Sequence, residues 1–112
     1  MCIRDSLAIG LVTSGYKPRR PRRFKLPGPS GRAAIELFLY QMHKGGYATG
    51  HDVTVGKKLA YIMTGGDIPS GHVVDEQHIL DLEREAFLSL CGDPNTQARI
   101  SHMLETGKPL RN

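Results

Sequence analysis

The sequence predicts an all-α protein with about four helices and a partial helix near its N-terminus. Apolar residues recur at steps of three and four in several stretches, which places them on one face of a helix. Glycines, prolines and capping residues separate these stretches, as they do at helix ends. Because no run of residues alternates cleanly between apolar and polar side chains, no β-strand is predicted.

The clearest helices lie in the last third of the chain, in residues 75–92 and 93–112. The apolar side of the first helix contains Ile79, Leu82, Ala86, Phe87 and Leu90. Gly92 is expected to end this helix in the left-handed conformation, Asp93 to cap the next helix, and Pro94 to occupy its first turn. The apolar side must pack on another surface.

Two more helices are predicted in the middle of the chain. Ser30 is expected to cap a helix from Gly31 to Lys44 that ends at the following pair of glycines. The apolar stripe of this helix consists of Ile35, Phe38, Leu39 and Met42. Thr49 and Asp52 form a Thr-x-x-Asp pattern that predicts a capping box for the second helix, which continues to Gly65.

The N-terminal part of the chain differs from the rest. Residues 1–6 resemble a translated sequencing adapter, so we interpret them as a non-native leader and exclude them from the fold. Residues 7–28 combine the tail of a helix with an extended connector rich in Arg and Pro, because proline disfavours both helix and central strand. Residues 29–112 form the helical region.

The composition indicates one small domain with a thin core. The chain has 112 residues, of which 39% are hydrophobic, with no Trp and 13 Gly, so marginal stability is expected. The two cysteines, Cys2 and Cys91, form neither a CxxC pair nor a zinc-ligand pattern, which favours a reducing cytoplasm. No stretch approaches the roughly 20 apolar residues of a membrane-spanning helix.

The net charge of +4 is distributed unevenly along the chain. Residues 1–32 hold eight of the 15 Lys and Arg residues but only one of the 11 acidic residues. The basic run consists of Lys17, Arg19, Arg20, Arg22, Arg23 and Lys25. Three interpretations stay open: a solvated connector, contact with an acidic surface or a ligand phosphate, and nucleic-acid binding. Tyr16 and Phe24 are too few to form a base-stacking platform.

No pattern in the sequence predicts catalysis or metal binding. Gly50 and Gly56 are separated by five residues, whereas a phosphate-binding loop needs four, so Gly56 is instead expected to let another backbone approach closely. The five histidines include no His-x-x-x-His pair, and no metal site is predicted. Glu83 and Glu85 are two residues apart and would point in different directions on a helix.

Two segments carry a resemblance to a known family. Residues 82–90 (LEREAFLSL) and 103–112 (MLETGKPLRN) resemble the C-terminal helices of enoyl-CoA hydratase (crotonase) domains. The match is to bifunctional fatty-acid β-oxidation proteins in which a 3-hydroxyacyl-CoA dehydrogenase precedes the hydratase-like domain. It extends over residues 7–112 and includes residues 56–61 and 64–67. The resemblance implies that the chain is a C-terminal fragment of a crotonase-like domain.

The resemblance implies cofactors for the parent protein, but no catalytic residue and only one ligand contact in the fragment. The parent would use NAD and a coenzyme A thioester, but the backbone donors and paired glutamates of hydratases come from the earlier, sheet-rich part of the family domain. No residue here is therefore assigned a catalytic role. Lys108, followed by Pro109, matches a Lys-Pro pair at the end of the family domain and is the one predicted acyl-CoA contact.

The sequence thus predicts an inactive helical part of a 3-hydroxyacyl-CoA dehydrogenase/enoyl-CoA hydratase, with a structural or acyl-CoA-pocket-covering role. Its partners would be the remaining hydratase-like and dehydrogenase domains of a parent protein that could itself be oligomeric, with no nucleic acid involved. The alternative is a free-standing helical interaction module whose Arg/Pro segment binds an acidic partner or nucleic acid.

Overall fold

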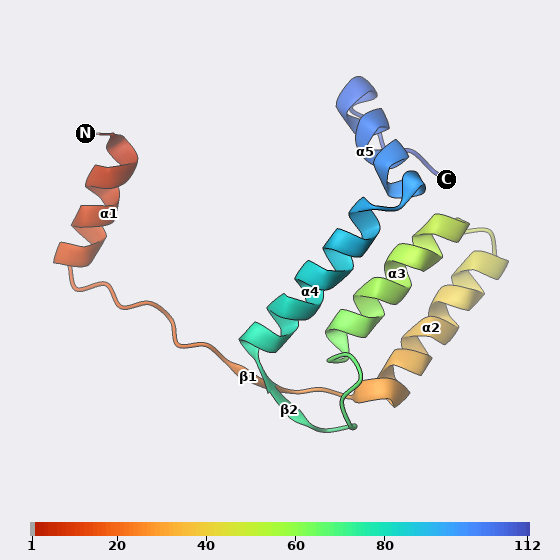
Figure 1. The fold of residues 1–112 in the computed structure, drawn as a ribbon, viewed down its shortest axis with the longest axis horizontal. Helices are drawn as coiled ribbons and strands as arrows, with labels where there is room; N and C mark the ends of the chain where they lie inside the picture. The colour runs from red at the N-terminus through yellow and green to blue at the C-terminus, as the bar shows by residue number, and fades with distance from the viewer. Residues whose placement is uncertain (1) are drawn as a thin grey trace.

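The computed structural model describes residues 2–112 and confirms an all-α architecture (Figure 1). Within these residues the structure contains five helices and one small sheet. The elements in chain order are α1 (Ile3–Thr13), β1 (Arg23–Lys25), α2 (Gly28–Lys44), α3 (Gly50–Met63), β2 (Val73–Asp75), α4 (Glu76–Cys91) and α5 (Pro94–Thr106).

Helices α2, α3 and α4 lie side by side with α3 in the middle, and α5 continues from the far end of α4 (Figure 1). Helix α1 stands apart, joined to the rest by an extended stretch of chain (Figure 1). The molecule measures 56 × 43 × 22 Å. A helix with its side chains is about 10–12 Å wide. The shortest dimension is thus about two helix widths and well below the other two, so the molecule as a whole is flat.

The N-terminal helix begins earlier than expected. Helix α1 starts at Ile3, inside the six residues that the sequence analysis excluded, and Cys2 caps it by accepting a hydrogen bond from the Asp5 N–H at 3.4 Å. Every residue of α1 is exposed to solvent. Residues 3–6 are thus helical in the structure, and that residues 1–6 are a non-native leader stays a prediction.

The prediction that the chain has no strand is wrong, because the structure contains two short ones. β1 and β2 pair in antiparallel fashion, with Phe24 opposite Val74 at the centre of the register. Each strand has only three residues, which is too short for the alternation that marks a strand in sequence. β1 lies within the predicted connector, so pairing with a distant segment converts part of the connector into structure.

Helix α2 begins before its predicted cap. It starts at Gly28, with Pro27 rather than Ser30 at the N-cap, and the Ser30 hydroxyl donates to the Pro27 carbonyl within the first turn. Gly28 has a φ of 69° and donates its N–H to the Thr64 carbonyl. A Cβ on Gly28 would lie 2.8 Å from the Ile68 carbonyl oxygen. The loop after α3 therefore fixes where α2 begins.

The remaining helix ends agree with the sequence except at Gly92 and at the end of α5. The last helix was predicted within residues 93–112, but α5 ends at Thr106. Thr49 and Asp52 form the predicted capping box, and Asp93 caps α5 with Pro94 in its first turn. Gly92 has a φ of −80° and not the expected left-handed conformation. Gly107, which ends α5, does adopt that conformation, with a φ of 70°.

The buried core is as thin as the composition suggests. Only Ala60, Val74 and Ala86 are buried among the hydrophobic residues that the structure describes. Gly56 contributes to the packing of α2 on α3, because a Cβ there would lie 2.6 Å from a methyl carbon of Leu39. The close neighbour of Gly56 is thus a side chain, whereas the sequence analysis expected a backbone.

Candidate functional site

An apolar groove runs between α3 and α4 on one side of the three-helix layer. Its volume is about 190 Å³, and its lining residues are Val55, Lys58, Leu59, Ile62, Glu83, Ala86, Phe87 and Leu90. We call it the α3–α4 groove. Leu59 is 53% exposed and Phe87 is 63% exposed. The apolar side that the sequence predicted for residues 75–92 is therefore only partly covered by α3.

The uncovered apolar surface extends beyond this groove. Phe38 on α2 is 57% exposed and Met63 at the end of α3 is 65% exposed. Helix α5 adds the exposed side chains of Ile100, Met103 and Leu104. A small domain normally buries the apolar faces of its helices against a second layer. These faces have no second layer within residues 2–112.

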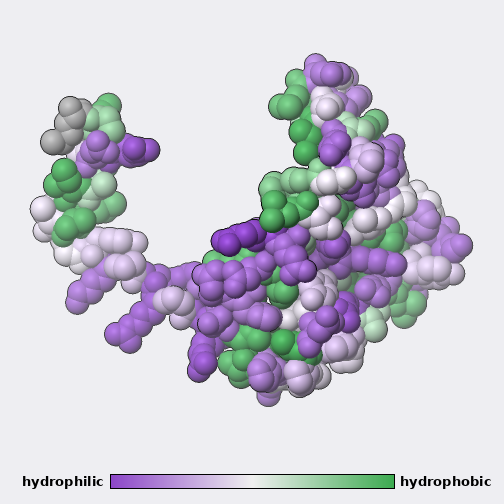
Figure 2. All heavy atoms as spheres, viewed as in Figure 1, coloured by the Kyte–Doolittle hydropathy of each residue, from purple (hydrophilic) through white to green (hydrophobic). Residues whose placement is uncertain are grey.

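A wider, polar cleft is formed by α2, α3 and α4. It has a volume of about 510 Å³ and is lined by Arg32, Glu36, Thr54, Lys57, Lys58, Tyr61 and Glu85. Figure 2 shows hydrophilic side chains across the middle of the helical layer on the side that it displays. The cleft mixes three cations with two carboxylates, so its charge pattern does not select a strongly anionic ligand.

Arg32 and Tyr61 are fixed at one end of this cleft. The Arg32 guanidinium lies 3.2 Å from an oxygen of Asp67 and 5.3 Å from the centre of the Tyr61 ring, while the Tyr61 hydroxyl donates to Asp67 at 3.4 Å. Burial raises the pKa of Tyr61, and the nearby carboxylates of Asp67 and Glu85 raise it further. Tyr61 is therefore a neutral hydrogen-bond donor at neutral pH rather than a base.

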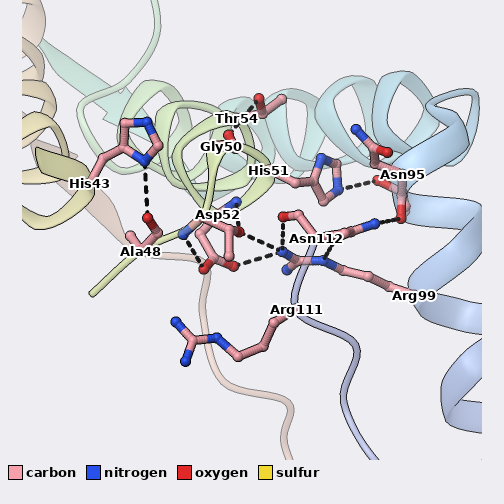
Figure 3. A network of polar contacts seen from close by, with 12 residues as sticks. His43, Ala48, Gly50, His51, Asp52, Thr54, Asn95, Arg99, Arg111 and Asn112 are labelled. Carbon is pink, nitrogen blue, oxygen red and sulfur yellow. Dashed lines mark hydrogen bonds and ion pairs between the residues drawn. The ribbon is translucent and has the colours of Figure 1, made fainter. Parts of the chain in front are cut away.

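A polar cluster connects α5, the start of α3 and the final residue of the chain (Figure 3). The Arg99 guanidinium donates to Asp52 at 2.8 Å, to the Thr49 hydroxyl at 3.2 Å and to the Asn112 side-chain oxygen at 2.6 Å. The Asn112 amide in turn donates to the Asn95 carbonyl at 3.0 Å. We call this set the Arg99 clamp.

Hydrogen bonds from Thr49 and Arg99 keep Asp52 ionised. Its pKa falls from 3.8 to about 2, chiefly because the Thr49 backbone N–H donates to the carboxylate and also because the Arg99 guanidinium does so. Partial burial opposes this shift. Asp52 is thus a permanently charged structural anion above pH 4 and has no proton to exchange in catalysis at neutral pH.

A second contact between the same elements involves a buried histidine. His51 is only 4% exposed, and its Nε2 lies 2.9 Å from the Thr96 hydroxyl on α5 (Figure 3). No spacing in the sequence indicated a partner for this histidine. The capping pattern at Thr49 and Asp52 predicted that α3 begins beside His51. Nothing in the sequence indicated that α5 would contact this end of α3.

Lys108, the predicted acyl-CoA contact, lies in the exposed tail after α5. Its backbone N–H donates to the Thr106 hydroxyl at 3.2 Å. Lys108 is absent from the lining of both the polar cleft and the α3–α4 groove. The structure does not bring it together with the cations of the cleft, and its role stays a prediction.

The basic run is exposed and mostly unpaired. Within residues 2–112, Arg19 is the one member whose side-chain cation lies within 4 Å of a carboxylate oxygen, that of Glu76 at 3.7 Å. The Arg22 backbone exchanges hydrogen bonds with Glu76 through its N–H and carbonyl. Glu76 thereby ties the end of the connector to the start of α4, while the other cations remain available to a partner.

The described residues contain neither a metal-binding cluster nor a membrane-spanning helix. Residues 2–112 contain no cluster of three His, Cys, Asp or Glu side chains placed to hold a metal ion. Cys2 is exposed and Cys91 is half-buried, and both are free thiols. None of the helices described is both long and apolar enough to cross a membrane.

Comparison with known proteins gives one informative similarity. No family model matches the chain, and no solved structure matches it. Over 106 residues, or 95% of its length, the chain is 49% identical to a Bacillus subtilis (strain 168) protein described as "Probable 3-hydroxyacyl-CoA dehydrogenase". The chain spans only 13% of that curated relative's length. The similarity therefore covers nearly all of this chain and a small part of the relative.

Proposed function

We propose that the chain is the helical C-terminal part of a fatty-acid β-oxidation enzyme of the 3-hydroxyacyl-CoA dehydrogenase/enoyl-CoA hydratase type. The observation that carries this proposal is the 49% identity to the Bacillus subtilis protein over 95% of the chain. The 13% coverage of that relative is consistent with a part of a larger enzyme. The hydratase portion rests on the resemblance of residues 82–90 and 103–112.

The residues described here do not fit an NAD site. The single sheet within residues 2–112 has two antiparallel strands of three residues, whereas dinucleotide-binding folds present the pyrophosphate at a glycine-rich turn between a parallel strand and a helix. NAD binding and catalysis therefore belong to the remainder of the proposed parent, and the chain contributes structure.

A chimera tests this proposal. Replacing the matching segment of the Bacillus subtilis relative with this chain should preserve its folding and 3-hydroxyacyl-CoA dehydrogenase activity, because the two segments share half of their residues. A relative that lacks the segment altogether should be less stable to heat. A deletion variant with unchanged thermal stability and dehydrogenase activity would contradict the proposed structural role.

The pocket-covering role makes a narrower prediction about Lys108. In the chimera, Lys108→Ala should raise the KM for acyl-CoA several-fold while leaving kcat unchanged, because a phosphate contact contributes to binding in both the ground and transition states. Lys57→Ala serves as the control, since its ammonium belongs to the polar cleft. An unchanged KM in the Lys108 variant would remove the coenzyme A contact from the proposal.

The second candidate function is an interaction module whose basic run binds an acidic partner or nucleic acid. The exposure of these cations supports it, and Figure 2 shows them as a hydrophilic connector between α1 and the helical layer. Titration with random duplex DNA at low and high ionic strength tests the nucleic-acid form of this proposal. Binding that weakens steeply with salt would favour it, and no binding at low ionic strength would eliminate it.

A further inference from the structure

We propose that the α3–α4 groove is a docking surface for an apolar element from the remainder of the parent enzyme, with Phe87 as its central contact. This inference rests on the proposed function and adds to it a specific surface and a specific occupant. The groove is the place where the helical layer would receive the rest of the polypeptide.

The chemistry of the groove selects an apolar occupant. Six of its eight lining residues are apolar, and the other two, Lys58 and Glu83, carry opposite charges. Protein interfaces are likewise rich in apolar residues and depleted of charged ones at their core. Phe87 can bury most of its ring only on contact with an added surface, since 63% of the residue is exposed.

Two features favour the remaining polypeptide over a second copy of this chain. The matching segment makes up 13% of the relative, so most of such a protein lies outside the segment and is available as a second layer. In addition, α1 exposes its own apolar residues, among them Leu7 at 66% and Val12 at 75%, on a separate arm (Figure 1). A large body can cover both the groove and this arm.

Adjacent residues on α4 provide a matched test. Phe87 lines the groove and Leu88 does not, yet they are 63% and 65% exposed. Phe87→Glu and Leu88→Glu therefore introduce the same charge at equally exposed positions of one helix. In the chimera, Phe87→Glu should shorten the half-life of thermal inactivation by about tenfold or more, because it places a charge in a buried contact. Leu88→Glu should leave the half-life close to that of the unsubstituted chimera.

The same substitutions in the isolated 112-residue chain distinguish docking from local packing. Neither should change its thermal melting followed by circular dichroism, because both positions are exposed there. Equal inactivation rates of the Phe87→Glu chimera and the unsubstituted chimera would overturn the docking surface while leaving the proposed function intact. Equal destabilisation in the isolated chain would also overturn it, because Phe87 would then act within the chain.

Thiol labelling provides a measurement that does not depend on the isolated chain. In the chimera, a maleimide should modify Phe87→Cys at least about tenfold more slowly than Leu88→Cys, with the unsubstituted chimera as background. Equal labelling rates would overturn the proposal.

The oligomeric state of the isolated chain tests the alternative occupant, a second copy. The docking proposal would be overturned if the isolated chain formed a concentration-dependent dimer that Phe87→Glu dissociates while the Phe87→Glu chimera was unaffected. A chimera inactive even without substitutions would reject the proposed function and this inference together.

Discussion

The two ends of the chain are held in opposite ways. The C-terminal end returns to the start of α3 through the Arg99 clamp, whose hydrogen bonds join α5, α3 and Asn112. The N-terminal arm, α1 with the connector, has every α1 residue exposed and meets the helical layer only near β1. Directional polar contacts can therefore fix a terminal helix where the apolar core is thin, whereas an apolar helix without a partner surface stays unattached.

The junction between the arm and the helical layer should be the most sensitive position. Gly28→Ala is expected to destabilise the chain by about 3 kcal/mol, because an alanine would be strained at a φ of 69° and its Cβ would meet the Ile68 carbonyl oxygen. Urea unfolding followed by circular dichroism measures the change.

Gly50→Ala is the matched control for the junction. A Cβ on Gly50 would meet nothing within 4 Å, and this residue begins a helix with ordinary φ. Its unfolding midpoint should stay equal or rise slightly, because alanine lowers the entropy of the unfolded chain. If both variants lost the same stability, the close packing at Gly28 would not be the cause.

Removing the clamp should have the next largest effect. Arg99→Ala is expected to cost about 2 kcal/mol, since it leaves the half-buried Asp52 and Asn112 oxygens without their donor. Hydrogen exchange should accelerate in α5 more than in α2. Arg84→Ala on the exposed part of α4 is the control, and equal losses in the two variants would refute a specific role for the clamp.

The clamp should also weaken in acid. The pKa of Asp52 is about 2 when folded and near its ordinary 3.8 when unfolded, so the unfolded state binds protons first as pH falls. The stabilising contribution of the ionised Asp52 carboxylate is complete above about pH 5 and is lost between roughly pH 5 and pH 2. In Asp52→Asn, the acid-induced fall of the unfolding midpoint should be smaller. An identical pH profile would show that other carboxylates control the acid limit.

Deleting α1 should have the smallest effect. Removal of residues 2–15 is expected to change the free energy of unfolding by less than about 0.5 kcal/mol, because α1 buries none of its residues. The same deletion should lower the helical circular dichroism signal in proportion to its length. A loss comparable to that of Arg99→Ala would mean that α1 packs on the helical layer in solution.

Sequence patterns predicted the local structure well and the long-range contacts poorly. The capping box at Thr49 and the start of α5 at Asp93 and Pro94 were correct, because these signals act over three or four residues. The two strands, the early start of α2 at Gly28 and the partners of Arg99 were missed. Each depends on a segment tens of residues away, which no local pattern encodes.

The α3–α4 groove likewise combines a feature predicted from the sequence with one that only the structure shows. The apolar side of α4 was predicted from the spacing of Ile79, Leu82 and Leu90, and so was its need for a packing partner. Only the structure shows that α3 covers this side partly and leaves Phe87 exposed beside a groove. How much apolar surface remains depends on how neighbouring helices pack, and Gly56 brings α2 and α3 close together.

By itself, the sequence determined the all-α class, most of the helix boundaries, the thin core and the basic arm, because propensity, capping and composition are local properties. The tertiary structure alone decided that α2, α3 and α4 lie side by side, that Arg99 fastens α5 to the start of α3, and that an apolar groove stays open. These features depend on contacts between segments that are distant in sequence, because only the packing of those segments determines which apolar surface is buried and which stays exposed.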